Sequence, residues 1–171
     1  MFIHLSDVFT SREKRLEVEA ELEMTGFDNG LERFEIAKKS PVSIVITHLE
    51  RGKVLVKADL ELTLRAACDR CLAEVPVSLD LHAERVVFSP ELAEETEEAD
   101  DQDFVDGYEL DVDAFAHDII IGNWPAKILC KESCKGICPV CGQNRNVREC
   151  GCDSFVPDPR MAVIQDIFNA K

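Results

Sequence analysis

Alternation of apolar and polar residues organises the first half of the chain. Residues 14–27 (KRLEVEAELEMTGF) alternate well, and residues 41–68 (PVSIVITHLERGKVLVKADLELTLRAAC) do so over a longer stretch. A period of two residues is typical of a strand that buries one face. We therefore predict a half-buried strand at 14–27. Residues 41–68 predict two strands joined by a turn at 51–53.

Two further segments complete the predicted sheet. Residues 75–88 (VPVSLDLHAERVVF) resume the alternation, so the CDRC sequence at 68–71 is predicted to form the tip of a hairpin between two long strands. The opening FIHLSDVF at 2–9 has apolar residues at mixed spacing, and we expect an edge strand there.

Two segments have the signals of helices rather than strands. A helix is predicted at about 112–123, with Asp111 or Asp113 as its N-cap and Pro125 beyond its end. A second, short helix is predicted at 158–168 (DPRMAVIQDIF), where Asp158 can cap and Pro159 suits the first helical position.

Cysteines gather where no apolar pattern is present. Six of the eight fall at 130–152 (CKESCKGICPVCGQNRNVRECGC), and the other two are in the CDRC sequence. The stretch has few apolar residues and is interrupted by glycine and proline, so it cannot form a core by itself. Disulfides, redox chemistry and metal binding all use closely spaced cysteines.

Metal binding explains these cysteines best. Disulfides are disfavoured because the chain opens without an export signal, and thiols inside cells stay reduced. A thioredoxin-like pair needs a strand-to-helix context, whereas CDRC lies between two predicted strands. In CPVCG at 138–142, the proline stiffens a metal-binding turn and Gly142 permits unusual dihedrals. We predict structural zinc, with two ions per chain; an iron–sulfur cluster uses the same ligands.

The eight predicted ligands can be divided in two ways. If ligands close in sequence share an ion (the arrangement called chain economy here), the last four cysteines bind one ion. The first four, which span some sixty residues, then bind the other. A crossed arrangement would instead place both C-x2-C turns on one ion. Loop-closure entropy rises slowly with length and does not decide between them. The predicted metal ligands are Cys68, Cys71, Cys130 and Cys134, with Cys138, Cys141, Cys150 and Cys152.

The formal net charge of −15 is concentrated in one segment. Twelve acidic residues lie at 91–113, called here the acidic belt, and no Lys or Arg occurs at 86–126. The rest of the chain carries only −3. Such a belt repels phosphate backbones and suits a basic partner. The alternative is a solvated loop that aids solubility.

Several functions have no residues to support them. No apolar run approaches the ~20 residues of a membrane span. The four histidines, His4, His48, His82 and His117, stand apart from one another and are expected to be surface or core residues rather than ligands. The sequence has no GxSxG, P-loop or dinucleotide fingerprint. We expect a cytoplasmic protein that is not an enzyme, with no membrane and no small-molecule substrate among its partners.

Several motifs together resemble one family. CDRCL at 68–72 resembles the C-x-R-C-L hairpin of the YceD family, the large ribosomal RNA subunit accumulation proteins. LDVDAFAHDIIIGNWPAKILC at 110–130 is similar to that family's acidic, then apolar, then proline-containing segment. CKGICPVCGQNRNVRECGC at 134–152 resembles C-K-G-L-C-P-x-C-G-x-x-x-N…C-x-C, and DPRMAVI follows at 158–164. The order and spacing agree over roughly 40–168.

The resemblance implies a bacterial or organellar factor in ribosome biogenesis. It would support accumulation of large-subunit (23S) ribosomal RNA without catalysis, and its partner would be a ribosomal protein or a large-subunit precursor. The alternative is a zinc-ribbon interaction module of another complex, such as the transcription machinery; a redox or metal-handling enzyme ranks third.

Direct RNA binding would need a basic face, and the cysteine-rich stretch is its best candidate. Residues 127–152 carry five basic side chains against Glu132 and Glu149. Each four-thiolate zinc site would add a charge of about −2, which offsets that excess. The basic residues are Lys127, Lys131, Lys135, Arg145 and Arg148.

The predicted fold class is α+β. Residues 1–126 would form an antiparallel β body with a long hairpin, an acidic loop at about 89–113 and the helix at about 112–123. Residues 127–171 would form a zinc-ribbon-like module with the closing helix, packed on the body.

Overall fold

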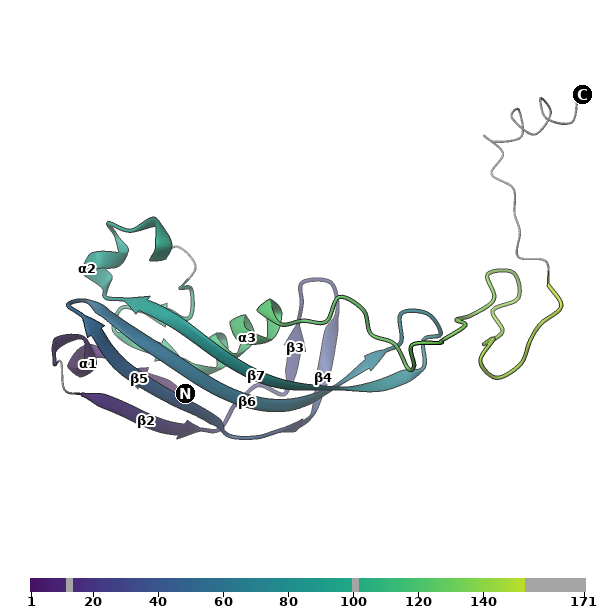
Figure 1. Cartoon of the computed structure of the whole chain (residues 1–171), viewed down its shortest axis with the longest axis horizontal. Coiled ribbons are helices and arrows are strands. Elements are labelled where there is room, and N and C mark those ends of the chain that lie inside the picture. The colour runs from purple at the N-terminus through teal and green to yellow at the C-terminus, as the bar shows by residue number, and fades with distance from the viewer. Residues whose placement is uncertain (12–13, 100–101, 153–171) are drawn as a thin grey trace, which may run out of the picture. The chain divides into compact units, whose positions relative to one another are not determined.

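The structure is a computed structural model that describes residues 1–11, 14–99 and 102–152 (Figure 1). The helix predicted at 158–168 lies outside these residues. The chain forms two compact units. The first, called the body, comprises Met1–Ala66 and Pro76–Ala126, and the second, called the cysteine module, comprises Ala67–Val75 and Lys127–Lys171. The tip of the long hairpin thus belongs to the cysteine module.

The main sheet of the body is antiparallel and has six strands. Their order is β2-β5-β6-β4-β3, and β7 pairs with β6. β5 pairs with the first part of β6 and β4 with a later part, so both follow the same strand in succession. Figure 1 shows β5, β6 and β7 as long, curved neighbours. The strands are β2 (Arg15–Ala20), β3 (Gly26–Asp28), β4 (Arg33–Lys39), β5 (Val42–Glu50), β6 (Lys53–Ala67) and β7 (Glu74–Phe88).

Alternating burial explains why these segments form strands. Every second residue of β6 from Val54 to Ala66 is buried, and its neighbours are exposed or half-buried. That pattern places one face of the strand in the core. The long hairpin of β6 and β7 is confirmed, and the turn between β5 and β6 contains Gly52 at φ 76°. The predicted antiparallel β body is therefore confirmed.

The N-terminal segment differs from its prediction. Only Phe2–His4 forms a strand, β1, and Ser6–Thr10 forms a short helix, α1. β1 joins a small antiparallel sheet in which β9 (Glu109–Asp111) is the central strand and β8 (Val105–Asp106) the other edge. The mixed apolar spacing has a physical reason, because Ile3 faces inward from a strand whereas Val8 and Phe9 face inward from a helix.

Helix α3 spans Val112–Gly122 and is fixed at its start by two carboxylates. Asp111 is the N-cap, and its Oδ1 accepts hydrogen bonds from the backbone N–H groups of Asp113 and Ala114. Asp113, the other candidate cap, instead accepts hydrogen bonds from the N–H groups of Glu23 and Met24. The buried residues of the helix are Val112, Phe115, Ala116, Ile119 and Ile120.

The acidic belt has more structure than the expected loop. It contains a short helix α2 (Pro90–Ala93), a 3-10 turn η1 (Glu97–Ala99), and strands β8 and β9. Buried Phe104 packs against Phe115 of α3, with ring centroids 4.8 Å apart. The side-chain amide of Gln102 binds both the N–H and the C=O of Phe88. These few anchors hold a polar segment against the end of the sheet.

An aromatic cluster joins β3, β4 and the segment after α3. Phe27 is fully buried, and its ring lies 4.9 Å from that of Trp124 and 6.3 Å from that of Phe34. The His117 ring of α3 lies 5.1 Å from Phe27.

The described residues contain no helix long and apolar enough to span a membrane.

We predict that Phe27→Ala lowers the free energy of unfolding by about 3–5 kcal/mol, because it removes a fully buried ring and leaves a cavity. Leu31→Ala, in the adjoining turn, is the control: Leu31 is 90% exposed, and its truncation should change the same quantity by less than ~0.5 kcal/mol. Urea unfolding followed by circular dichroism measures both. Equal effects of the two substitutions would contradict the packing described here.

Candidate metal centres

The first cysteine cluster joins the hairpin tip to the start of the cysteine-rich stretch. The sulfurs of Cys68, Cys71, Cys130 and Cys134 all lie within 4.8 Å of one another. Cys68 and Cys71 come from the turn between β6 and β7, and the other two come from residues far along the chain. Cys68, Cys71 and Cys134 are buried, while Cys130 is exposed. We call this group tetrad 1.

The spacing of tetrad 1 fits a single four-coordinate ion. The sulfurs of Cys68 and Cys134 lie 3.9 Å apart, and those of Cys71 and Cys130 lie 3.6 Å apart. A tetrahedral ion with metal–sulfur bonds of about 2.3 Å separates its ligands by about 3.8 Å. A disulfide would require about 2.05 Å, and all eight cysteines are free. The ligands of a multi-iron cluster bind different iron atoms and would spread farther.

The second cluster is local in sequence. The sulfurs of Cys138, Cys141, Cys150 and Cys152 also lie within 4.8 Å of one another, and we call this group tetrad 2. Cys138 is buried, Cys141 is exposed, and Cys150 and Cys152 are half-buried. The grouping is the one that chain economy favours, and the two C-x2-C turns do not share a tetrad. Both tetrads could therefore hold a metal ion.

The two C-x2-C turns have the same backbone geometry. In the first, the N–H of Leu72 donates to the C=O of Cys68, and the N–H of Cys68 donates to Ala73. In the second, the N–H of Gly142 donates to the C=O of Cys138, and the N–H of Cys138 donates to Gln143. These bonds close each turn so that both of its sulfurs reach the same centre.

The residue after the second cysteine of each turn is left-handed. Gly142 has φ 71°, as its predicted role requires, and Leu72 has φ 58°. Leu72 is the only residue other than glycine with a positive φ among the described residues. The matching hydrogen bonds give the reason: the turn imposes this conformation even where a side chain resists it.

Hydrogen bonds favour the thiolate form of Cys68 in tetrad 1 and of Cys138 in tetrad 2. Burial raises the pKa of Cys68, but the N–H groups of Cys130, Arg70 and Cys71 lower it more, so that it falls to about 6. The N–H groups of Cys141 and Val140 lower the pKa of Cys138 to about 6. Both thiols are therefore largely ionised at neutral pH, and thiolates are the form that binds metals.

Four other thiols have raised pKa values and hold protons that a cation would displace: Cys71 and Cys130 in tetrad 1, and Cys150 and Cys152 in tetrad 2. Hydrogen bonding with Cys71 raises the pKa of Cys130 to about 12. In tetrad 2, hydrogen bonding with Cys141 raises the pKa of Cys152 to about 12. Metal binding must release these protons, so the affinity of both tetrads should fall as the pH falls.

Asn146 supports tetrad 1 from outside the ligand set. Its Nδ2 donates a hydrogen bond to Cys134 Sγ at 3.2 Å, and its Oδ1 accepts one from the N–H of Lys135 at 2.9 Å. Its Nδ2 also donates to Asn144 Oδ1 at 3.0 Å, which fixes the amide. A donor to a thiolate sulfur stabilises its negative charge. Asn146 is the Asn of the C-P-x-C-G-x-x-x-N motif, but sequence reasoning did not assign it a role, because only the fold shows its contact with the sulfur.

The CDRC turn is clamped to distant residues by its own two central side chains. Asp69 Oδ2 accepts a hydrogen bond from the N–H of Ile128 at 2.7 Å. Arg70 Nη1 donates to the C=O of Cys134 at 3.0 Å, and the C=O of Arg70 accepts from Ile137. Gly136 is required there, because a Cβ would lie 2.9 Å from the Arg70 carbonyl oxygen.

The four histidines lie outside both tetrads. His48 Nδ1 lies 2.8 Å from the carbonyl oxygen of Val8, and His117 Nε2 lies 2.8 Å from that of Asp28. His82 pairs with Asp59 on the exposed face of the sheet, and this hydrogen bond raises its pKa. His4 lies 4.0 Å from Glu109. Each of these contacts is local to the body.

Comparison with known proteins gives one match. A family model described as large ribosomal RNA subunit accumulation protein YceD matches residues 56–168. The match begins within β6 and contains all eight cysteines. No curated protein and no solved structure matches the chain.

We predict that the two tetrads bind metal separately. Cys71→Ser should remove one ion and increase hydrogen exchange at the hairpin tip and around Cys130, because three thiolates hold a dication poorly. Cys141→Ser should remove the other ion and increase exchange at 138–152. Elemental analysis and hydrogen exchange on both variants measure this. Loss of both ions from either variant, or unchanged metal content, would contradict two separate sites.

We predict that Asn146→Ala weakens metal binding at tetrad 1 by about 10–100-fold, as expected when a supporting hydrogen bond to a ligand is lost. Val147→Ala is the matched control, because Val147 adjoins Asn146 in the chain and its side chain is 81% exposed. Competition with a chelator on the Cys141→Ser background isolates tetrad 1. Equal affinities of the two variants would show that the Asn146 contact has no influence on the metal.

Proposed function

The chain belongs to the YceD family, and on that premise we propose that it is a cytoplasmic, non-catalytic factor in ribosome biogenesis. It would support accumulation of large-subunit (23S) ribosomal RNA. The observation that supports this most is the family match, which spans residues 56–168 and carries the description large ribosomal RNA subunit accumulation protein. The matched residues include most of β6, all of β7, the acidic belt, α3 and the described part of the cysteine module that follows α3.

We propose that each tetrad binds one zinc ion and that the cysteine module is zinc-ribbon-like. Each tetrad brings four sulfurs within 4.8 Å of one another, and four cysteine thiolates are a ligand set that zinc prefers in structural sites. The shared geometry of the two C-x2-C turns supports the ribbon-like description. The zinc would be structural, because the buried cluster in the described part of the module is small and is formed by Cys68, Cys71 and Cys134 with Val75 and Leu129 packed against it.

The completeness of both tetrads also supports a role without catalysis. A catalytic zinc site keeps one coordination position open for water or substrate. Each tetrad supplies four sulfurs within 4.8 Å of one another, so an ion held by all four has no open position. The metal would then maintain the shape of the module rather than take part in a reaction.

We propose two domains, which correspond to the body and the cysteine module. The body has its own core of alternating strands and α3, whereas the module depends on its cysteines and on the Asp69 and Arg70 hydrogen bonds. Loss of metal should therefore unfold the module and leave the body folded.

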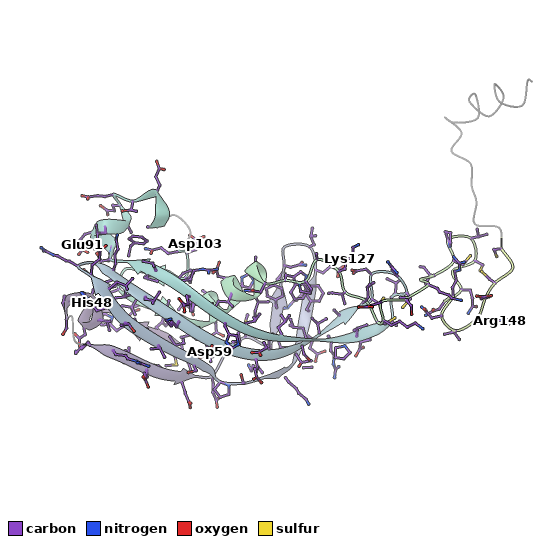
Figure 2. All side chains as sticks on the ribbon, in the orientation of Figure 1. His48, Asp59, Glu91, Asp103, Lys127 and Arg148 are labelled. Carbon is purple, nitrogen blue, oxygen red and sulfur yellow. The ribbon has the colours of Figure 1, made fainter. Side chains whose placement is uncertain are left out.

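We propose that the partner is a basic ribosomal protein, bound through the acidic belt. Glu94, Glu95 and Glu97 are exposed, as are Asp103 and Asp106. Lys and Arg are absent from the belt sequence, and the N-terminal ammonium group of Met1 lies 3.4 Å from Asp113 at its end. Anchoring by Gln102 and Phe104 holds part of this charge in place. Figure 2 shows Glu91 and Asp103 at the same end of the body.

The basic residues of the cysteine module give less support to an RNA contact. Lys127 and Arg148, labelled in Figure 2, are among its basic side chains. Lys135 is paired with Glu149, with 2.6 Å between Nζ and Oε1, and this hydrogen bond lowers the pKa of Glu149. Two four-thiolate zinc sites would add about −4 in total. A net attraction to phosphate is therefore not expected from this module.

We predict that neutralising the belt slows association with basic ribosomal proteins. Glu94, Glu95 and Glu97 changed to Gln, with Asp106→Asn, should lower the association rate more than they raise the dissociation rate, because exposed charges steer encounter. The effect should shrink as salt rises, since charges are screened over ~8 Å at physiological ionic strength. Surface plasmon resonance at several salt concentrations measures this. Binding to naked ribosomal RNA should instead strengthen or stay the same.

The same variant tests the biological role. In cells that lack the protein, the wild-type chain should restore the ratio of large- to small-subunit ribosomal RNA, and the neutralised variant should restore it less. A control of equal charge change neutralises four exposed carboxylates outside the belt, in or next to β2 and β4: Glu17, Glu19, Glu21 and Glu35. Failure of the wild-type chain to alter the ratio would overturn the proposed function. Full activity of the belt variant would show that the acidic belt is not needed for the proposed function.

A further inference from the structure

A surface groove lies in the body, beside the residues that anchor the acidic belt. It has a volume of about 850 Å³ and is formed by α3, β7, the belt residues 102–104 and Met24. From α3 it takes Ala114, His117, Asp118 and Ile121, which follow the spacing of one helix face. All of its lining residues belong to the body, so one unit contains the whole groove.

The groove combines an apolar surface with carboxylates. Val86 and Ile121 line it and are 43% and 47% exposed, so each leaves apolar surface accessible. Asp103 and Asp118 also line it, and Asp113 adds a third carboxylate. Apolar surface between acidic groups suits a side chain with an aliphatic stem and a cationic end.

Asp113 is already engaged by the N–H groups of Glu23 and Met24, whereas the basic side chains of the groove leave one oxygen of Asp118 without a hydrogen bond. Arg85 Nη2 lies 3.5 Å from Asp118 Oδ2, yet that oxygen is shielded from solvent and accepts no hydrogen bond from the described residues. His117 is engaged with the carbonyl oxygen of Asp28, outside the acidic group. The Asp118 side chain as a whole is still 38% exposed, and Asp103 is exposed, so a donor from outside could reach both carboxylates.

We propose that this groove binds an arginine side chain from an extended, basic segment of a partner protein. The stem of the arginine would lie on Val86 and Ile121, and its guanidinium would bind Asp103 and Asp118. Arginine fits better than lysine because its planar guanidinium makes paired hydrogen bonds with carboxylates and is weakly hydrated. This inference rests on the proposed function, because it places the basic ribosomal protein in a particular site.

RNA is a poor occupant of the same groove. Phosphate groups would face at least two carboxylates, the Phe104 ring is buried, and the His117 ring already lies 5.1 Å from that of Phe27. The acidic belt continues from the groove through Asp103 and Asp106, so a basic segment seated there would remain next to negative charge along its length.

The test uses the full, metal-loaded chain and a short synthetic peptide of alternating arginine and leucine. Amide chemical-shift changes should concentrate at residues 85–86, 102–104 and 114–121. Asp118→Asn and, separately, Asp103→Asn should each weaken peptide binding about tenfold, as for loss of a charged hydrogen bond. Replacing the arginines by citrulline, which keeps the shape and removes the charge, should weaken it by at least as much.

Glu94→Gln separates this groove from the belt as a whole. It removes one exposed charge from the belt but does not line the groove, so it should change affinity less than about twofold. Ile121→Ser should weaken binding without changing its salt dependence. The groove proposal would be overturned if Glu94→Gln and Asp118→Asn weakened binding equally, or if the chemical-shift changes spread evenly along the belt. Either result would still be consistent with steering by the belt. The thermal unfolding temperature of each variant shows whether weaker binding comes from a lost contact or from a destabilised fold. Asp103→Asn is the variant least able to disturb folding, because Asp103 is exposed.

Discussion

Four sulfurs that meet between the hairpin tip and the residues after α3 are the constraint on which the cysteine module depends. Cys68 and Cys134 are separated by 66 residues, and Cys71 and Cys130 by 59. The sulfurs alone have no strong attraction for one another, because neutral thiols make weak hydrogen bonds and thiolates repel. A cation at their centre would turn this repulsion into attraction. The surrounding hydrogen bonds from Asp69, Arg70 and Asn146 then orient the chain around that centre.

The body is held together by its hydrophobic core rather than by its cysteines, so its stability does not depend on metal. Alternating strands and the buried face of α3 give it a core that needs no ligand. That core also fixes the acidic belt through Phe104 and Gln102, and it presents the groove along the outer face of α3. The body thus offers negative charge in a defined place, while the module would offer a shape stabilised by bound metal. A factor that binds basic proteins during ribosome assembly would use the first property most directly.

Much of the fold follows from local pattern. The long hairpin is evident from period-two alternation, and α3 from Asp111, its apolar spacing and Pro125. The structure of the belt and of the N-terminus was harder to predict from the sequence. Single aromatic anchors hold these segments and make no periodic pattern: Phe9, Phe104 and Tyr108. The sequence also predicted Gly142 as a left-handed residue, whereas Leu72 has the same conformation without the signal that glycine gives. The motif around CPVCG includes Asn146, but its hydrogen bond to Cys134 is known only from the fold. The groove is formed by segments that lie far apart in the sequence, and no local pattern could reveal it.

X-ray absorption spectroscopy on the reduced, purified protein tests the central claim most directly, because it reports the element and the ligands at each centre. The account predicts zinc at both tetrads, each with four sulfur ligands at about 2.3 Å and no second metal nearby. A shell containing nitrogen or oxygen would contradict the assignment of four cysteines to each ion. Iron with iron–iron scattering would replace the zinc assignment by a cluster, and the absence of any bound metal would remove the interaction on which the module depends.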